Sequence, residues 1–155
     1  MIKLVAFDLD GTIADTIPMC IEAFKQAVTP YASKILSEDD IVKTFGLNEE
    51  GMIKQVVAED WEKALIDFYT IYKEMHTMYI QPFTEIRELI TELKENSLIV
   101  SLVTGKGQKS CDITLRHFEM EALFDNISIG SPDRNTKAES CLLYTSPSPR
   151  DLSTS

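Results

Sequence analysis

The 155-residue sequence has little of what disulfide frameworks, membrane segments and nucleic-acid binding require. It contains three cysteines, an odd number, and no Cys-x-x-Cys pair, which indicates reduced thiols and a cytoplasmic protein. No apolar run approaches the roughly 20 residues of a transmembrane helix. The apolar run at the start is too short for a signal peptide and stops at two acids. We therefore expect neither a secreted scaffold nor a membrane protein.

Basic residues are also scarce. Asp and Glu number 25 against 15 Lys and Arg, which gives a formal net charge of −10. This balance argues against nucleic acid or an anionic membrane as a partner. With 44% hydrophobic and 26% charged residues, the composition is that of a globular protein with one domain, or with a small core that carries an inserted lobe.

Residues 3–12 are the most informative stretch. Four apolar residues after Lys3 predict a strand that is buried on both faces. Asp8 and Asp10 follow, and because alternate residues of an extended chain point the same way, their carboxylates should converge. Close carboxylates repel each other unless a cation or a shared proton separates them. Gly11 would allow a sharp turn whose amides are free to face an anion, so a hard dication and a phosphate would satisfy these groups together.

The same stretch resembles motif I of the haloacid dehalogenase (HAD) superfamily, hhhhDxDGT followed by (L/I)xD(S/T), with Ile13-Ala14-Asp15-Thr16 as the continuation. The resemblance implies that Asp8 is the nucleophile that becomes an aspartyl phosphate. It implies that Asp10 is the general acid and base, and that both carboxylates bind Mg²⁺. The phosphate-binding residues that it implies in this motif are Asp8, Leu9, Asp10, Gly11 and Thr12.

A run of helices is predicted between this motif and the next strand. Four helices are expected, because apolar residues recur at spacings of three and four. They cover 17–28, a short stretch that begins after an N-cap at Ser37, about 49–58, and about 61–79. The size and place of this run resemble the helical cap of many HAD phosphatases, which closes over the site and supplies specificity. We expect core at 1–16, cap at 17–80 and core again at 81–139.

The returning core carries a second candidate motif. Thr84 is predicted to cap a helix over 85–95 and Asn96 to end it in the left-handed conformation. A strand over 98–104 then ends at Thr104, followed by Gly105. In the HAD superfamily a Thr here is catalytic, because its hydroxyl and the next amide hold the transferring phosphoryl group, so the resemblance assigns phosphate binding to Thr104 and Gly105. The spacing required for a nucleotide-binding P-loop is absent.

A helix from about 108 to 118 should point its N-terminus at the phosphate site, and a third strand is expected near 124–130. In the family a lysine after this strand bridges nucleophile and phosphate. Lys137 is the candidate for this catalytic and phosphate-binding role, and Arg134 is its competitor. Lys106 or Lys137, together with a dication, would supply the local positive centre that an acidic phosphate-binding protein needs.

The C-terminal stretch, 140–155, is rich in Ser, Thr and Pro and has no usable period. It resembles translated sequencing-adapter read-through and is excluded from fold reasoning. A full HAD core has a further strand with an acidic Gly-Asp motif, which we do not find before this tail. We therefore expect a core that lacks its C-terminal part, and a chain that is poorly stable and nearly inactive as written.

The predicted fold is α/β, a Rossmann-like three-layer core with a parallel sheet, interrupted by an all-helical cap. The predicted function of the intact parent is Mg²⁺-dependent hydrolysis of a phosphomonoester, a small phosphorylated metabolite, through an aspartyl-phosphate intermediate, as in the phosphoglycolate phosphatase group. A sugar-phosphate mutase of the β-phosphoglucomutase type shares every motif and stays open. A non-catalytic binding domain on the same fold is the alternative from another class.

Overall fold

The computed structural model describes residues 1–133 and 135. In chain order its elements are β1 (Leu4–Phe7), α1 (Ile17–Val28), α2 (Glu38–Val42), α3 (Glu49–Val56), α4 (Trp61–Tyr79), α5 (Ile86–Glu95), β2 (Ile99–Val103), α6 (Gln108–His117), the 3-10 helix η1 (Glu121–Leu123) and β3 (Asn126–Ser128). Within these residues, no helix has the length and apolar character needed to cross a membrane. Lys137, Arg134 and the predicted tail lie outside the described part of the chain.

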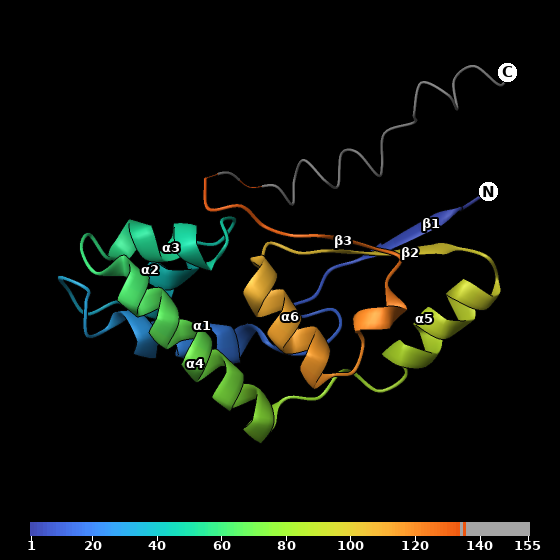
Figure 1. Ribbon diagram of the computed structural model, residues 1–155, viewed down its shortest axis with the longest axis horizontal. Helices are drawn as coiled ribbons and strands as arrows, with labels where there is room; N and C mark the ends of the chain where they lie inside the picture. Colours follow the sequence, from blue (N-terminus) through green and yellow to red (C-terminus); the bar gives the residue numbers. More distant parts are fainter. Residues whose placement is uncertain (134, 136–155) are drawn as a thin grey trace, which may run out of the picture.

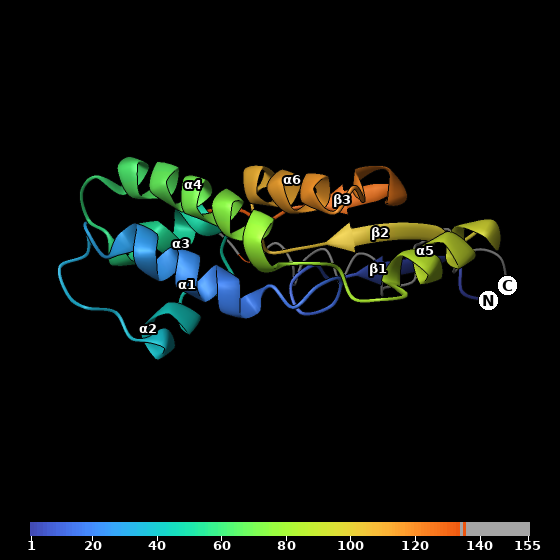
Figure 2. The same ribbon diagram turned by 90° about the horizontal axis from the view of Figure 1, so that it is seen from below.

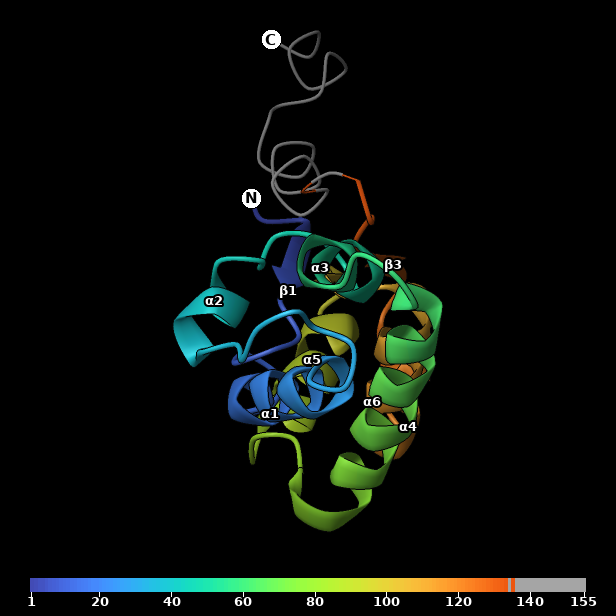
Figure 3. The same ribbon diagram turned by 90° about the vertical axis from the view of Figure 1, so that its left-hand side faces the viewer.

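The three strands form one parallel sheet in the order β1-β2-β3. Leu4 pairs with Ile99, and Ser101 with Asn126. Both connections step across the sheet in the same direction, so right-handed crossovers place α5 and α6 on one face, as Figures 1 and 3 show. The α/β class with a parallel sheet is confirmed. The described residues supply the sheet and one of the helical layers.

A first hydrophobic cluster, the sheet core, fills the space between the strands and these two helices. Side chains of one face of the sheet, among them Val5, Phe7, Val100 and Leu102, meet Ile90 of α5 and the apolar stripe of α6. Burying such side chains stabilises the fold by about 1.5–3 kcal/mol each. On the other face Ile99 is 44% exposed, whereas Ser101 and Val103 farther along the strand are buried.

A second cluster, the helical core, lies among helices α1 to α4, which we call the helical lobe. Phe24 of α1 packs edge-on against Phe68 of α4, with ring centroids 6.4 Å apart, and Tyr72 stacks on Phe68 at 5.3 Å. The apolar stripe predicted along residues 61–79 thus packs into a core, and Phe68 and Tyr72 are almost fully buried in it. Figure 2 shows the helical lobe beside the sheet, at the end toward which the strands run.

Two local predictions in the connection to α5 are wrong. Glu85, with φ +73°, precedes the helix in place of a Thr84 cap, and no side-chain cap bond forms. Asn96 has φ −84°, and the left-handed residue is Ser97 with φ +62°. Elsewhere the capping chemistry is as expected: the Ser37 hydroxyl accepts the Asp40 amide in a capping box.

Candidate active site

A cavity of about 270 Å³ opens where the carboxyl ends of β1 and β2 meet the helical lobe. Ligands of open parallel sheets bind at this edge because loops from neighbouring strands converge there. The lining residues come from the loops after β1 and β2, from α1, α3 and α4, from the loop between α2 and α3, and from the segment after β3: Asp8, Asp10, Ile17, Cys20, Phe24, Phe45, Gly46, Leu47, Glu49, Met52, Phe68, Gly105, Lys106 and Asn135. The predicted residues Asp8, Asp10 and Gly105 therefore share one cavity.

The turn after β1 positions Asp8. Its Oδ1 accepts the amide of Leu9 at 2.8 Å, and Gly11 has φ +77°, as a sharp turn requires. The Gly11 amide, however, donates to the Ala14 carbonyl at 2.8 Å, and the Thr12 amide donates to the Leu9 carbonyl at 3.2 Å. Because the turn uses both donors itself, the prediction that these amides face a phosphate is wrong for this conformation.

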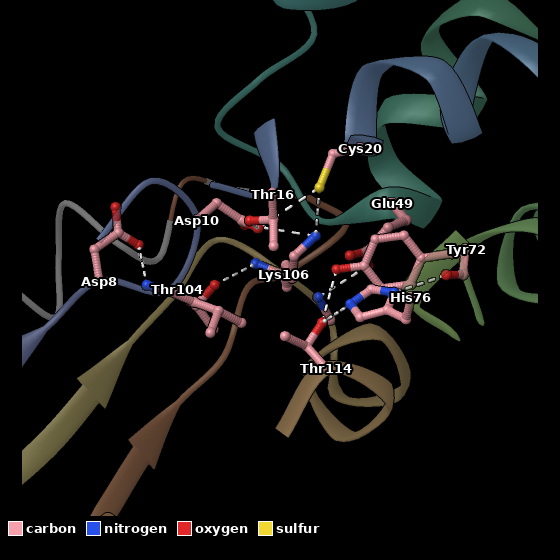
Figure 4. Close-up of polar contacts among 12 residues, drawn as sticks. Asp8, Asp10, Thr16, Cys20, Glu49, Tyr72, His76, Thr104, Lys106 and Thr114 are labelled. Atoms are coloured by element: carbon pink, nitrogen blue, oxygen red, sulfur yellow. Dashed lines mark hydrogen bonds and ion pairs between the residues drawn. The ribbon is translucent and has the colours of Figure 1, made fainter. Parts of the chain in front are cut away.

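Asp10 is held by three side chains. Its Oδ1 accepts from the Thr16 hydroxyl and from the Cys20 thiol, the latter at 3.6 Å, and its Oδ2 lies 3.5 Å from Lys106 Nζ. Figure 4 shows that Asp10 points toward Lys106, whereas the Asp8 carboxylate turns toward the Leu9 amide. The two carboxylates line the same cavity, but their oxygens face different partners.

Lys106 supplies a buried positive charge beside Asp10. Its Nζ lies 3.2 Å from Cys20 Sγ and 4.5 Å from the centre of the Tyr72 ring. Burial opposes this charge, but the carboxylates of Asp10 and, to a smaller extent, Glu49 more than compensate and hold the pKa of Lys106 well above its usual range. The sequence predicted Lys106 as one source of a local positive centre, and its place beside Asp10 agrees with that role.

Cys20 remains a neutral thiol. Burial raises its pKa to about 11, although Lys106 opposes this shift. Its sulfur therefore contributes no second negative charge beside Lys106.

Thr104 is buried directly below the cavity and is not part of its lining. Its hydroxyl accepts the Lys106 amide at 3.2 Å, and its own amide donates to the Ser128 carbonyl at 3.0 Å. Gly105 lines the cavity, and a Cβ added there would meet no atom within 4 Å. The end of β2 thus brings a backbone segment next to Asp8, as predicted.

A second buried polar group, which sequence reasoning missed, joins α4 to α6. The Nδ1 of His76 lies 2.7 Å from the Tyr72 carbonyl and its Nε2 lies 2.9 Å from Thr114 Oγ1. A carbonyl only accepts, so Nδ1 carries the proton, Nε2 accepts from Thr114, and the Tyr72 hydroxyl donates to Thr114 at 2.8 Å. Chiefly through burial, the pKa of His76 falls to about 4.

Glu49 was also missed. It is the first residue of α3 and only 5% exposed, and its Oε2 accepts the amide of Gly107 at 2.9 Å. This bond joins the helical lobe to the N-terminus of α6. Figure 4 labels Glu49 among the polar residues near Lys106. Its sequence neighbours gave no signal, because Gly107 lies 58 residues away.

Asp8 and Asp10 also fit a hard dication by donor chemistry. Mg²⁺ takes oxygen ligands and commonly binds through one or two carboxylates, with waters and substrate phosphate completing its shell. Among the described residues, no group of three or more His, Cys, Asp and Glu side chains could hold a metal ion. Asp8 and Asp10 as metal ligands therefore stay a prediction from the sequence.

Comparisons with known proteins agree with this geometry. A family model described as haloacid dehalogenase-like hydrolase matches residues 5–145. The pyrophosphatase PpaX of Bacillus mycoides is 23% identical over 124 residues, which cover 80% of this chain and 58% of that protein. A PpaX relative from Caldanaerobacter subterraneus is 26% identical over 132 residues, 85% of this chain and 60% of its own. The chain thus spans about three fifths of the length of these curated relatives.

Solved structures show the same fold. A predicted phosphoglycolate phosphatase from Haemophilus somnus aligns with a TM-score of 0.65 and 23% identity, over 83% of this chain and 63% of that one. CbbY from Rhodobacter sphaeroides, crystallised with phosphate, aligns with a TM-score of 0.72 and 17% identity, over 95% and 74% of the two chains.

Proposed function

The chain belongs to the haloacid dehalogenase-like hydrolase family, and from this premise we propose that the intact parent expected from the sequence hydrolyses a small phosphomonoester with the help of Mg²⁺. The observation that carries the proposal is the position of Asp8. It follows β1 directly, lines the cavity and stands two residues before Asp10, which contacts a buried lysine. The named activity of the relatives, pyrophosphate hydrolysis, also belongs to phosphoryl transfer.

In the proposed reaction a carboxylate oxygen of Asp8 attacks phosphorus, and the bond from phosphorus to the leaving oxygen breaks. Asp10, protonated at the start of this step, donates its proton to that oxygen and becomes the carboxylate that Lys106 contacts. Water then attacks the aspartyl phosphate, Asp10 accepts its proton, and phosphate leaves with Asp8 restored. When bound by Asp8 and Asp10, Mg²⁺ would neutralise part of the charge that gathers in these steps.

Lys106 and Thr16 would serve this reaction by holding Asp10. The ammonium and the hydroxyl contact different oxygens of the carboxylate, so the two groups together orient the side chain in the cavity. We further propose the predicted roles of Thr104 and Gly105 in holding the phosphoryl group. The same role for Lys137 rests on the sequence.

The helical lobe is proposed to act as the cap. Its side chains Phe24, Phe45, Met52 and Phe68 cover the cavity on the side opposite the strand ends. An apolar cover excludes bulk water, which strengthens electrostatic interactions below it and protects the aspartyl phosphate from uncontrolled hydrolysis.

The test is phosphate release from a panel of monoesters with Mg²⁺, by the intact parent and by its Asp8→Asn variant. Removing a nucleophile costs at least about 10³-fold in turnover. Asp39→Asn, the same substitution on the exposed surface of α2, should leave turnover unchanged. Undiminished phosphate release by Asp8→Asn would remove Asp8 from the nucleophile's role. Release of an isomeric sugar phosphate without free phosphate would identify the mutase instead.

A further inference from the structure

The cavity has two unlike walls. Below, at the strand ends, lie Asp8, Asp10 and Lys106, which are the groups proposed to handle the phosphoryl group. Above, on the helical lobe, the wall is mostly apolar, and Glu49 is the charged side chain that it contributes. A substrate whose phosphorus sits at Asp8 must direct its leaving group toward this upper wall, so the chemistry of the upper wall selects the leaving group.

Glu49 is fixed in that wall. It is 5% exposed, and the Gly107 amide donates to its Oε2 at 2.9 Å. The approach is close, since a Cβ added to Gly107 would lie 2.8 Å from the same oxygen. A carboxylate that is buried and bound in this way does not swing out of the cavity to make room for another anion.

The lining also lacks a spare positive charge among the described residues. Asp8, Asp10 and Glu49 are its carboxylates, and Lys106 is its one ammonium. That ammonium is already 3.5 Å from Asp10. A dication at Asp8 and Asp10 would balance the phosphoryl group, but a second anion on the leaving group would face Glu49 in a medium where like charges repel strongly.

We propose that Glu49 is a specificity residue that rejects substrates with a second negative charge on the leaving group. The substrate class is then a phosphomonoester of a small neutral, largely apolar alcohol, as the Phe24, Phe45 and Phe68 side chains of the upper wall favour. This inference rests on the proposed function for the position of the phosphoryl group. Inorganic pyrophosphate and carboxylated phosphoesters are accordingly poor ligands.

The test measures binding, so that it does not depend on turnover. Isobutylphosphonate and phosphonoacetate have nearly the same shape and differ by one negative charge on the arm. Titration calorimetry with Mg²⁺ present, corrected for ligand and metal mixed without protein, gives the two dissociation constants. We expect isobutylphosphonate to bind at least about tenfold more tightly, a difference of about 1.4 kcal/mol.

Glu49→Gln removes the charge but keeps an oxygen that accepts the Gly107 amide. It should tighten phosphonoacetate binding several-fold and leave isobutylphosphonate nearly unchanged. Glu50→Gln is the matched control, because Glu50 is the next residue and pairs with Lys54 at 2.5 Å. In this variant the ratio of the dissociation constants of the two phosphonates should equal that of the unmodified chain. A role of Glu49 in structure alone would weaken both ligands together.

Tighter binding of phosphonoacetate, an unchanged ratio in Glu49→Gln, or no binding of either phosphonate would each overturn the inference. The proposed hydrolase activity fails on a different result. If the phosphonates discriminate as expected but no monoester releases phosphate, the selectivity stands and the hydrolase proposal does not.

Discussion

The helical lobe and the sheet are built from different kinds of contact. Helices α1 to α4 come from one continuous stretch, 17–79, and aromatic side chains such as Phe24 and Phe68 pack against each other in their core. The sheet joins distant segments, since Leu4 pairs with Ile99. Local contacts form with a smaller loss of chain entropy than non-local ones. The helical lobe therefore depends on its own segment, whereas the sheet depends on correct pairing across the whole chain.

The two parts meet through buried polar contacts as well as apolar ones. Lys106 reaches Cys20, Gly107 donates to Glu49, and Thr114 contacts Tyr72. Polar contacts of this kind are specific in geometry but add only about 0.5–1.5 kcal/mol each. The strand ends thus fix the reactive carboxylates, while the position of the helical lobe depends on this small set of hydrogen bonds together with apolar contacts such as that of Ile113 with the helical core.

The largest effect on stability should come from a large-to-small substitution in one hydrophobic core at a time. Phe68→Ala and Leu102→Ala each remove a buried side chain and should cost about 3–5 and 2–5 kcal/mol of unfolding free energy, respectively. Hydrogen exchange of the backbone amides separates the two variants. Phe68→Ala should lower protection more in α1 and α4 than in β1 and β2, and Leu102→Ala should lower it more in β1 and β2 than in α1 and α4. Equal loss of protection everywhere would show one cooperative unit and remove the distinction between the two parts.

The sequence predicted the helical lobe better than the sheet. The helices predicted from about 17 to 28 and from about 61 to 79 are confirmed, because a helix is determined by periodicity within one segment. The third strand was expected over 124–130 and covers Asn126–Ser128. Asp125 meets β2 partly through its side chain, whose Oδ2 accepts the Val100 amide at 2.8 Å, and apolar patterning does not reveal such a contact.

The same limit applies to the site. Asp8, Asp10 and Gly105 could be predicted because each follows a strand, and the structure brings them to one cavity. Glu49 and His76 could not, because their partners lie 58 and 38 residues away on another helix. Gly11 shows the opposite error: its conformation was predictable, but the bond of its amide to Ala14 was not.

A smaller effect, on activity, tests the polar contacts between the two parts. Lys106→Met keeps much of the buried volume but removes the ammonium beside Asp10. Because Asp10 then loses a partner that orients it, kcat/KM for phosphate release should fall roughly 10²-fold. Lys109→Met is the control, since Lys109 lies over the Tyr69 ring 4.4 Å away and is exposed. Equal activity of both variants would exclude Lys106 from positioning Asp10.

The smallest effect concerns pH, and it acts where α4 meets α6. His76 has a pKa of about 4 in the folded protein against about 6.5 when unfolded. Its contribution to stability is therefore fully present above pH 6.5 and is lost as the pH falls toward 4, because the unfolded chain binds the proton first. Lys106 and His117 face the ring and add to the penalty on its charged form, whereas the charge of Asp10 acts in the opposite direction.

Urea unfolding at pH 7.5 and 4.5 measures this contribution, which should be roughly 2–3 kcal/mol for His76. His76→Phe keeps an aromatic ring in the space that packs against Tyr72, 4.3 Å between ring centroids in the unmodified chain, but it has no titrating group. The variant should lose less stability than the parent on acidification, even if it is less stable at neutral pH. His117→Gln should keep most of the pH dependence, since burial is the main cause of the lowered pKa of His76 and His117 adds only a smaller part. If His76→Phe and the parent lose the same free energy between the two pH values, carboxylates elsewhere account for the loss, and the junction between sheet and helical lobe is not pH-sensitive through His76.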